Sequence, residues 1–571
     1  MVAKYKEIYI CMNKLILFII FIWTFVACTE CDIDAGIKEG NSVDQKFTGK
    51  SEFRSKVPFY SFSNELEKQK KELDQNPLLK RFKNSRKKQS QDPYRPLYHY
   101  INPEGNLNDP NGLCFWQGRW HLFYQAYPPE DPRQHWGHAV STDLIHWEDL
   151  PLAIYPNPEE KCFSGQTLVE HDRVIAAYPG INFGLIIAIS SDPLLLNWEK
   201  LKMNPIDATT GQPTKRPMGD ACIWKEGEYY YVLSGGKRGK GTKRKRTERL
   251  HRSKNLVDWE INFVDNFRQN DRYAMVGDDG SCPNFWPIGD RHMLLSFSHV
   301  TGGNYSLGNY DVEQQKFCIT DYGQFNFGGI YEPGAVLAPS STPDGNGNIN
   351  VIFNMAYAKP TLGWDQIMTL PRKLTLISEN QIAVAPAGDI ESLRTNHQQI
   401  RGLKIPPNQE VILEKIQGNS MEIKVSVDVK ESQSFTINVL RSPDKEEYTR
   451  ITFFKNKGIR DYDRYEGWEY KKWIDAKYSL ISIDNSRSSI LPDVMSNPPE
   501  TGPFHLPEGQ ALELRIFIDK SVVEVFANNR QCVAVRVYPG LQESTGVSVR
   551  SQGSESKIIA LDAWQMTNIY E

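Results

Sequence analysis

The sequence lacks the features that would place it in several protein classes. Its 571 residues carry 67 Lys and Arg against 70 Asp and Glu, so no excess charge of one sign predicts a polyanionic partner. No C-x-x-C pair occurs beyond residue 31, and six cysteines are scattered from Cys114 to Cys532, which argues against a disulfide framework or a zinc site. No cluster of ligand residues calls for a metal, and we expect no cofactor.

Long apolar runs are also scarce, and the run near the N-terminus is short. It spans residues 15–27 behind three lysines, which is too short for an ordinary membrane span and typical of an export signal. It ends in Phe25-Val26-Ala27-Cys28, which resembles the cleavage box of bacterial lipoproteins. We therefore expect residues 1–28 to be a lipoprotein-type signal, Cys28 to be lipidated, and the protein to be exported and held by its lipid on a bacterial membrane. Plain secretion is the alternative.

The segment after the signal has little apolar character. Residues 29–91 are polar and rich in Lys, Glu, Ser and Asn, which predicts a tether between the membrane and the folded part.

What the sequence does contain is an internal repeat. A phrase of the form Ser-x-Asp/Asn, followed by an apolar residue and then Trp-Glu, occurs at residues 141–148, 190–199 and 253–260. A second series, strand–turn–strand, has turn markers at residues 118, 172, 227, 289 and 347. The flanking runs are β-branched and aromatic, as hairpins require. Five such units predict an all-β fold, a five-bladed β-propeller over residues 92–390. A generic β-sandwich array is the alternative.

A different strand pattern follows the repeats. Residues 391–408 are polar and predict a linker. Beyond them, residues 511–519, 521–526 and 533–537 alternate apolar and polar side chains with period two. Strands with one buried and one solvent-exposed face predict a C-terminal antiparallel β-sandwich over residues 409–571.

Acidic residues precede the first strand of several repeats. Asp109 lies in Asn108-Asp109-Pro110-Asn111-Gly112, Asp220 opens the third unit, and the pair Asp278-Asp279 opens the fourth. A propeller gathers one strand start from each blade at its centre, so these carboxylates are expected to meet there. Asp-Pro and Asn-Gly are also ordinary turn signals, so the argument rests on the repeated placement.

Several carboxylates in one funnel suit the cleavage of a glycosidic bond. The leaving oxygen needs a proton while the sugar carbon needs a nucleophile or negative charge. Crowding and burial separate the pKa values of neighbouring acids, so one site can supply a protonated and an ionised group together. Aromatic rings could stack on the sugar, and the candidates are Trp116, Trp136, Phe163 and Trp286, although Trp116 and Trp286 fit a propeller core better.

With these motifs in place, the chain resembles glycoside hydrolase family 32, the invertases, inulinases and levanases. Asn108–Gly112 looks like the family's nucleophile motif, and the segments around Gln125, Trp136 and Phe163-Ser164-Gly165 resemble its sugar-site motifs in order and spacing. Residues 514–526 look like its C-terminal sandwich signature.

The resemblance implies hydrolysis of sucrose or fructans with retention of configuration. Asp109 would be the nucleophile that forms a fructosyl-enzyme, and Asp220 would bind fructose hydroxyls and stabilise the transition state. The fructose pocket would be lined by Asn108, Gln125, Trp136, Phe163 and Ser164.

Two motifs depart from the family pattern. Its Arg-Asp-Pro reads Gly219-Asp220-Ala221 here, so one cation is missing. Its Glu-Cys-Pro, which carries the acid/base, reads Ser281-Cys282-Pro283, and a serine hydroxyl is too weak an acid for that role. We expect Asp279 to be the proton donor, with Asp278 and Glu332 as alternatives.

These departures leave other functions open. A fructan-binding surface lipoprotein without catalysis is one, and a related five-bladed glycosidase acting on another furanoside is a second. The nine Lys and Arg between residues 237 and 252 could suggest nucleic-acid binding, but they lack interleaved aromatic residues, so we expect a solvated loop and no nucleic-acid partner.

Overall fold

The computed structural model describes residues 53–214, 218–238, 245–264, 266–269, 278–330, 334–457 and 478–570. The predicted signal, Cys28 and the first part of the predicted tether lie outside these residues, as does Glu332. Within the described part of the chain, no helix is both long and apolar enough to cross a membrane.

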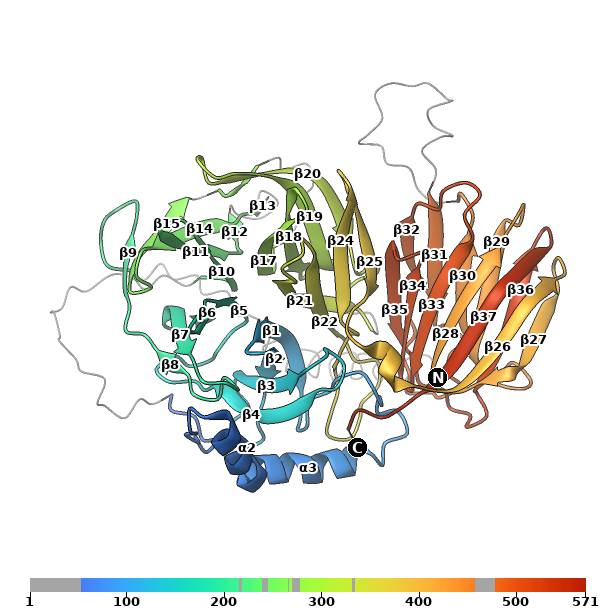
Figure 1. The fold of residues 1–571 in the computed structure, drawn as a ribbon, viewed down its shortest axis with the longest axis horizontal. Helices are drawn as coiled ribbons and strands as arrows, with labels where there is room; N and C mark the ends of the chain where they lie inside the picture. The colour runs from blue at the N-terminus through green and yellow to red at the C-terminus, as the bar shows by residue number, and fades with distance from the viewer. Residues whose placement is uncertain are drawn as a thin grey trace, which may run out of the picture. The chain divides into compact units, whose positions relative to one another are not determined.

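The first part of the chain forms five sheets arranged in a ring, as Figure 1 shows, and their strands pair mainly in antiparallel fashion. Each sheet runs outward from its innermost strand, and most neighbouring strands are joined by short turns. The first two blades consist of Leu107–Trp116 (β1), Arg119–Ala126 (β2), His135–Ser141 (β3), Glu148–Ile154 (β4), and Gln166–Val169 (β5), Val174–Gly180 (β6), Gly184–Ser190 (β7), Glu199–Lys200 (β8).

The third and fourth blades each receive an additional short strand that pairs in parallel with the outermost one. Their strands are Asn204–Asp207 (β9), Ala221–Glu226 (β10), Tyr229–Ser234 (β11), Arg249–Ser253 (β14), Asp258–Val264 (β15), and Arg268–Gln269 (β16), Ser281–Ile288 (β17), Arg291–Ser298 (β18), Gly302–Asp311 (β19), Lys316–Gln324 (β20). A separate two-stranded ribbon follows β11 and consists of Lys237–Arg238 (β12) and Lys245–Arg246 (β13).

The fifth blade completes the ring. It consists of Val336–Pro343 (β21), Ile349–Met355 (β22), Ile367–Met368 (β23), Arg372–Ser378 (β24) and Gln381–Pro386 (β25). The five innermost strands, β1, β5, β10, β17 and β21, contact one another in ring order, with β21 returning to β1. The predicted five-bladed propeller is therefore confirmed.

The repeated Ser-x-Asp/Asn phrase forms the turn between the third and fourth strands of the first three blades. Asp143 and Asn255 accept hydrogen bonds from the backbone amides of the residues two and three positions later, and Asp192 accepts from the amides two, four and five positions later. A buried leucine in each turn adopts positive φ, at Leu144 and Leu256 among them. The side-chain oxygens accept hydrogen bonds from the backbone amides of the turn, and these bonds offset the energetic cost of the positive φ.

The segment before the propeller differs from the predicted tether. From residue 53 it packs on the first two blades, and it contains helices Leu66–Gln75 (α2) and Pro77–Gln89 (α3). Asn76 caps α3 by accepting from the amides of Leu78 and Leu79, and Phe82 is buried against blade 1. The segment is polar in composition because its helices are amphipathic, and their few apolar residues face the propeller.

The C-terminal part is a sandwich of two six-stranded antiparallel sheets, as predicted. In spatial order one sheet is Arg394–Ile405 (β26), Ser556–Met566 (β37), Ser420–Asp428 (β28), Leu512–Asp519 (β33), Val522–Ala527 (β34), Gln531–Arg536 (β35). The other is Glu410–Gln417 (β27), Gly546–Gln552 (β36), Ser434–Arg441 (β29), Thr449–Phe454 (β30), Ser479–Asp484 (β31), Glu500–Phe504 (β32). The predicted linker 391–408 is instead largely structured, because it contains most of the 3₁₀ turn Ile390–Leu393 (η3) and all of β26.

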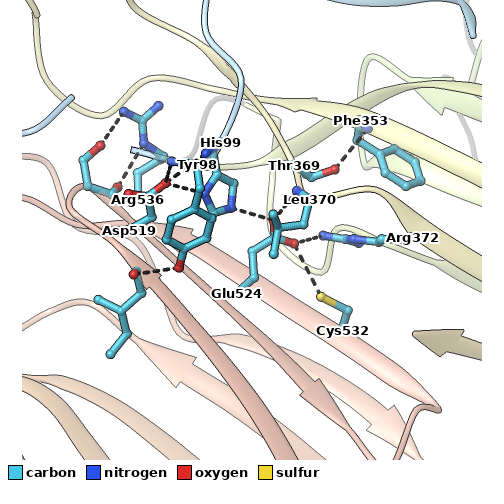
Figure 2. Close-up of polar contacts among 12 residues, drawn as sticks. Tyr98, His99, Phe353, Thr369, Leu370, Arg372, Asp519, Glu524, Cys532 and Arg536 are labelled. Atoms are coloured by element: carbon cyan, nitrogen blue, oxygen red, sulfur yellow. Dashed lines mark hydrogen bonds and ion pairs between the residues drawn. The ribbon is translucent and has the colours of Figure 1, made fainter. Parts of the chain in front are cut away.

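A buried polar network joins the sandwich to the propeller (Figure 2). The backbone amides of residues 97–99 donate to the Asp519 carboxylate, and His99 bridges Asp519 and Glu524 at 2.8 and 3.1 Å. Arg372, from the fifth blade, donates to Glu524 at 2.8 Å. All four side chains are fully buried, so each charge depends on its partners in place of water.

Candidate active site

Asp109 lies at the inner end of blade 1, in a bulge. The pairing of β1 with β2 shifts register between Leu107 and Pro110, so Asp109 has no partner across the ladder. A bulge of this kind redirects a side chain away from its regular strand position. The Asp109 Oδ2 atom accepts from Ser164 Oγ at 2.6 Å and from Gln125 Nε2 at 3.3 Å, and Gln125 also donates to Ser164. The sequence-predicted nucleophile and two predicted sugar-site residues thus form one cluster.

Asp220 joins this cluster from the start of blade 3. Its Oδ2 atom accepts from the Cys282 amide at 2.9 Å and lies 3.4 Å from the Cys282 Sγ atom. The same sulfur lies 3.5 Å from Asp109 Oδ2, so one buried thiol touches both carboxylates. Cys282 has φ +47°, at an irregularity in the β17–β18 pairing, and this conformation directs its amide to Asp220.

Three glycines bring blades 3 and 4 close together beside Asp220. A Cβ atom on Gly219 would lie 2.3 Å from the carbonyl oxygen of Gly235, and a Cβ on Gly235 would lie 2.1 Å from that of Gly280. No side chain fits at either position without backbone movement. The packing explains why the family's arginine has no counterpart here: residue 219 has no room for any side chain.

Both carboxyl groups have raised pKa values. Removal from bulk water, followed by the negative charge of Asp109, raises the pKa of Asp220 to about 6. Removal from water also raises the pKa of Asp109, although hydrogen bonds from Ser164 and Cys282 oppose the change. Both carboxyl groups of the site therefore bind a proton more tightly than an exposed aspartate does.

Asp279 is held at the same end of blade 4 by a histidine. The β17–β18 register pairs Ser281 with Phe297, and two residues beyond them Asp279 faces His299. Asp279 accepts from the His299 amide at 3.2 Å and lies 2.6 Å from His299 Nδ1. The positive charge of His299 interacts with both Asp109 and Asp220 and acts to lower the pKa of each. Sequence reasoning missed His299, which the hairpin spacing around Ser281 could have revealed.

Asp278 points into a different environment. It is buried and accepts from Arg246 Nη1 at 3.1 Å and from the Gly280 amide at 3.1 Å, and Arg246 also pairs with buried Glu248. The Gly280 backbone lies directly against the Arg246 guanidinium. These ion pairs support the turn that carries Asp279 and leave Asp278 engaged by a cation. Arg246 also corrects the prediction of a solvated basic loop, since part of that stretch is buried; residues 239–244 lie outside the described part.

The remaining predicted sugar-site residues fall into two groups. Asn108 is half-buried and accepts from Asn354 Nδ2 at 3.1 Å, while Phe163 is half-buried beside Ser164. Trp136 is fully buried, with its ring against Phe123 and Tyr178, and it donates to the Phe163 carbonyl at 3.0 Å. Its observed role is to fix the backbone of Phe163, and contact between Trp136 and a sugar stays a prediction.

Trp116 and Trp286 are also buried, in agreement with the core role that the sequence favoured for both. Among the described residues, no group of three or more His, Cys, Asp and Glu side chains is arranged to hold a metal ion.

The fold and the site define the class: a five-bladed propeller with a C-terminal sandwich and a pair of acids at the propeller's inner strand ends. The family model described as "Glycosyl hydrolases family 32 N-terminal domain" matches residues 99–386, and the model described as "Glycosyl hydrolases family 32 C terminal" matches residues 389–565. The chain belongs to glycosyl hydrolases family 32, and it is a glycoside hydrolase by class.

Similar proteins come from plants and bacteria. The chain is 28% identical over 554 residues to fructan 6-exohydrolase from Beta vulgaris, covering 83% of this chain and 87% of that protein. It is 25% identical over 524 residues to levanase from Bacillus subtilis, covering 84% and 71%. The fold is similar to that of fructan 1-exohydrolase IIa from Cichorium intybus, with a TM-score of 0.69, 22% identity and coverage of 83% of this chain and 98% of that one.

Proposed function

We propose that this protein hydrolyses β-fructosidic bonds in sucrose or fructans with retention of configuration. The observation that carries the proposal is the meeting of Asp109 and Asp220 from separate blades across the Cys282 thiol. Asp109 has donors on its Oδ2 atom that orient it, as a nucleophile requires. Asp220 binds fructose hydroxyls and stabilises the positive charge that develops on the sugar.

The reaction proceeds in two steps. An Asp109 oxygen forms a bond to the anomeric carbon while the glycosidic bond breaks and the leaving oxygen takes a proton. Water then attacks the same carbon, gives up a proton, and releases fructose and the Asp109 carboxylate. Each step inverts the configuration at the anomeric carbon, so the two steps together retain it. Asn108, Gln125, Phe163 and Ser164 surround the fructosyl unit in this scheme.

The test is release of fructose from sucrose, inulin and levan, with product configuration followed by NMR. Asp109→Ala is expected to abolish release, because no other carboxylate occupies the nucleophile position. A matched control is Asp172→Ala, which removes an exposed carboxylate in the turn between β5 and β6. Fructose release by the Asp109 variant at an undiminished rate would contradict the proposal.

A second candidate is a fructan-binding protein without turnover, and Ser281 favours it by standing where the family's proton donor is expected. Calorimetry distinguishes the two. Heat of binding to inulin with no fructose released over many hours would support the binding protein, whereas steady release supports the enzyme. Turnover of arabinan in place of fructan would instead identify a glycosidase for another furanoside.

The lipid anchor is part of the proposal. The short apolar run before Cys28 supports export and attachment to a bacterial membrane through a lipid on that cysteine. Cys28→Ser is expected to move the protein from the membrane fraction to the soluble fraction of the producing cell. A membrane-bound variant would contradict lipidation at this residue.

A further inference from the structure

The site needs a proton donor, and the residue at the family's donor position cannot serve. Ser281 begins β17, and its hydroxyl remains protonated far above neutral pH. Among the described residues near Asp109 and Asp220, the other titratable groups that interact with them include the Cys282 thiol, His299 and the Tyr127 phenol. Burial and the Asp109 charge raise the pKa of the phenol further, so it is a poor acid. The Cys282 thiol is buried and its pKa is raised, first by burial and then by the two carboxylates, so it is a poor acid.

His299 has the geometry of an oriented acid. Its Nδ1 atom lies 2.6 Å from Asp279 Oδ2, and its backbone amide donates to the other oxygen of the same carboxylate. Both contacts fix the ring relative to the hairpin, and the edge of the Phe297 ring packs against it with centroids 4.7 Å apart. Within the described part of the chain Nε2 has no hydrogen-bond partner, and 54% of the side chain is exposed. The second nitrogen is thus open to a ligand.

We propose that His299, oriented by Asp279, protonates the leaving oxygen in place of the missing glutamate. This inference rests on the proposed function and names the donor within that same site. His299 is then a catalytic residue, and Asp279, the sequence-predicted donor, is a positioning residue that acts through it. The arrangement is that of a carboxylate holding an imidazole in one tautomer and stabilising its charged form.

The proton balance closes over the two steps. In the first, the imidazolium gives its Nε2 proton to the glycosidic oxygen as the bond from that oxygen to the anomeric carbon breaks and Asp109 bonds to the carbon. The alcohol leaves and the imidazole is neutral. In the second, Nε2 takes a proton from the attacking water as the bond to Asp109 breaks. The imidazolium and the Asp109 carboxylate are both restored.

The charges around His299 favour its protonated form. Burial would lower the pKa of His299, but the hydrogen bond and charge of Asp279, on the same hairpin, outweigh it. The carboxylates of Asp109 from blade 1 and Asp220 from blade 3 act in the same direction, so the pKa is raised above 6.5. A donor of this kind is lost as the pH rises through its pKa.

The test compares His299→Gln and Asp279→Asn in the full-length protein, with His292→Gln as a matched control. His292 lies on the same strand pair, and its pKa is perturbed only by burial, with no charge from the site acting on it. His299→Gln is expected to lower kcat on sucrose and inulin by about 10²–10⁴-fold and to remove the alkaline limb of the pH–rate profile. An aryl β-fructofuranoside, whose phenol needs no proton to leave, should still release phenol in the first turnover at close to the normal rate, followed by a slow steady rate because the second step also lacks its base.

Asp279→Asn is expected to have a different signature. The donor remains, but without its carboxylate partner the pKa of His299 falls, so the alkaline limb moves to lower pH instead of vanishing. If Asp279→Asn abolishes turnover while His299→Gln keeps the normal kcat and alkaline limb, Asp279 is itself the donor and the inference is overturned. An equal loss of the first-turnover rate with natural and aryl substrates in His299→Gln would also overturn it.

The experiments distinguish a wrong assignment of the proton donor from a wrong proposed function. If the unmodified protein releases no fructose from any substrate, or if Asp109→Ala remains active, the proposed function fails. If the unmodified protein is active and Asp109→Ala is not, the function stands and the histidine variants decide the donor alone. Equal melting temperatures of the variants and the unmodified protein exclude misfolding as the cause of any loss.

Discussion

The buried ion pair between Arg372 and Glu524 allows a stability prediction with a worked magnitude (Figure 2). Burial alone would raise the pKa of Glu524, but the charge of Arg372, followed by the hydrogen bond from His99, lowers it from 4.5 to about 2. At about 1.36 kcal/mol per pKa unit, the difference corresponds to roughly 3 kcal/mol of stability. That figure agrees with the roughly 3–5 kcal/mol lost when one partner of a buried pair is removed.

Arg372→Met is therefore expected to destabilise the protein by about 3–5 kcal/mol at pH 7. Unfolding entropy of about 2.1 cal/mol/K per residue, over the roughly 480 described residues, gives about 1.0 kcal/mol/K, so the melting temperature should fall by about 3–5 °C. Because the folded-state pKa of Glu524 is depressed, the contribution is present above pH 4.5 and is lost as the pH falls toward 2. The deficit of the variant should narrow across that window.

Differential scanning calorimetry at one scan rate, from pH 3 to pH 8, measures this difference. Arg401→Met is the matched control, because Arg401 pairs with Asp562 at 2.7 Å but its side chain is 47% exposed. Its removal should cost less than about 1 kcal/mol. The reasoning is refuted if Arg372→Met melts within 1 °C of the unmodified protein at pH 7, or if its deficit is as large at pH 3 as at pH 7.

Three further predictions concern the site. Because the pKa of Asp220 is about 6 and its ionised form stabilises the transition state, kcat/KM should fall on the acid side of about pH 6, and a profile flat to pH 4.5 would contradict this. Gly235→Ala should greatly lower kcat, because its Cβ would force the Gly280 turn away from Asp220; unchanged kinetics would refute the packing argument. Ser164→Ala removes a donor from Asp109 and should lower kcat by about tenfold or more, given roughly 1.5–3 kcal/mol for a hydrogen bond to a charged group, whereas an unchanged kcat would show that Gln125 suffices.

The sequence predicted the parts of this fold that depend on local patterns. Turn markers at regular spacing gave the number of blades, and period-two alternation gave the sandwich, because each hairpin is formed by residues close together in the chain. The same spacing placed Asp109 and Asp220 at inner strand ends. By contrast, the helical nature of residues 66–89 was missed, because helices that bury only a few apolar residues have a polar composition.

Side-chain partners, in contrast, were decided by the tertiary structure. Nothing local distinguishes Asp278 from Asp279, yet one is paired with Arg246 from the β12–β13 ribbon and the other with His299 across its own hairpin. The sequence by itself determined which strands form and which acids begin them. The tertiary structure alone decided which charged groups lie close enough to interact. A pKa or an ion pair depends on separations of a few ångströms, and the residues concerned lie far apart in the chain.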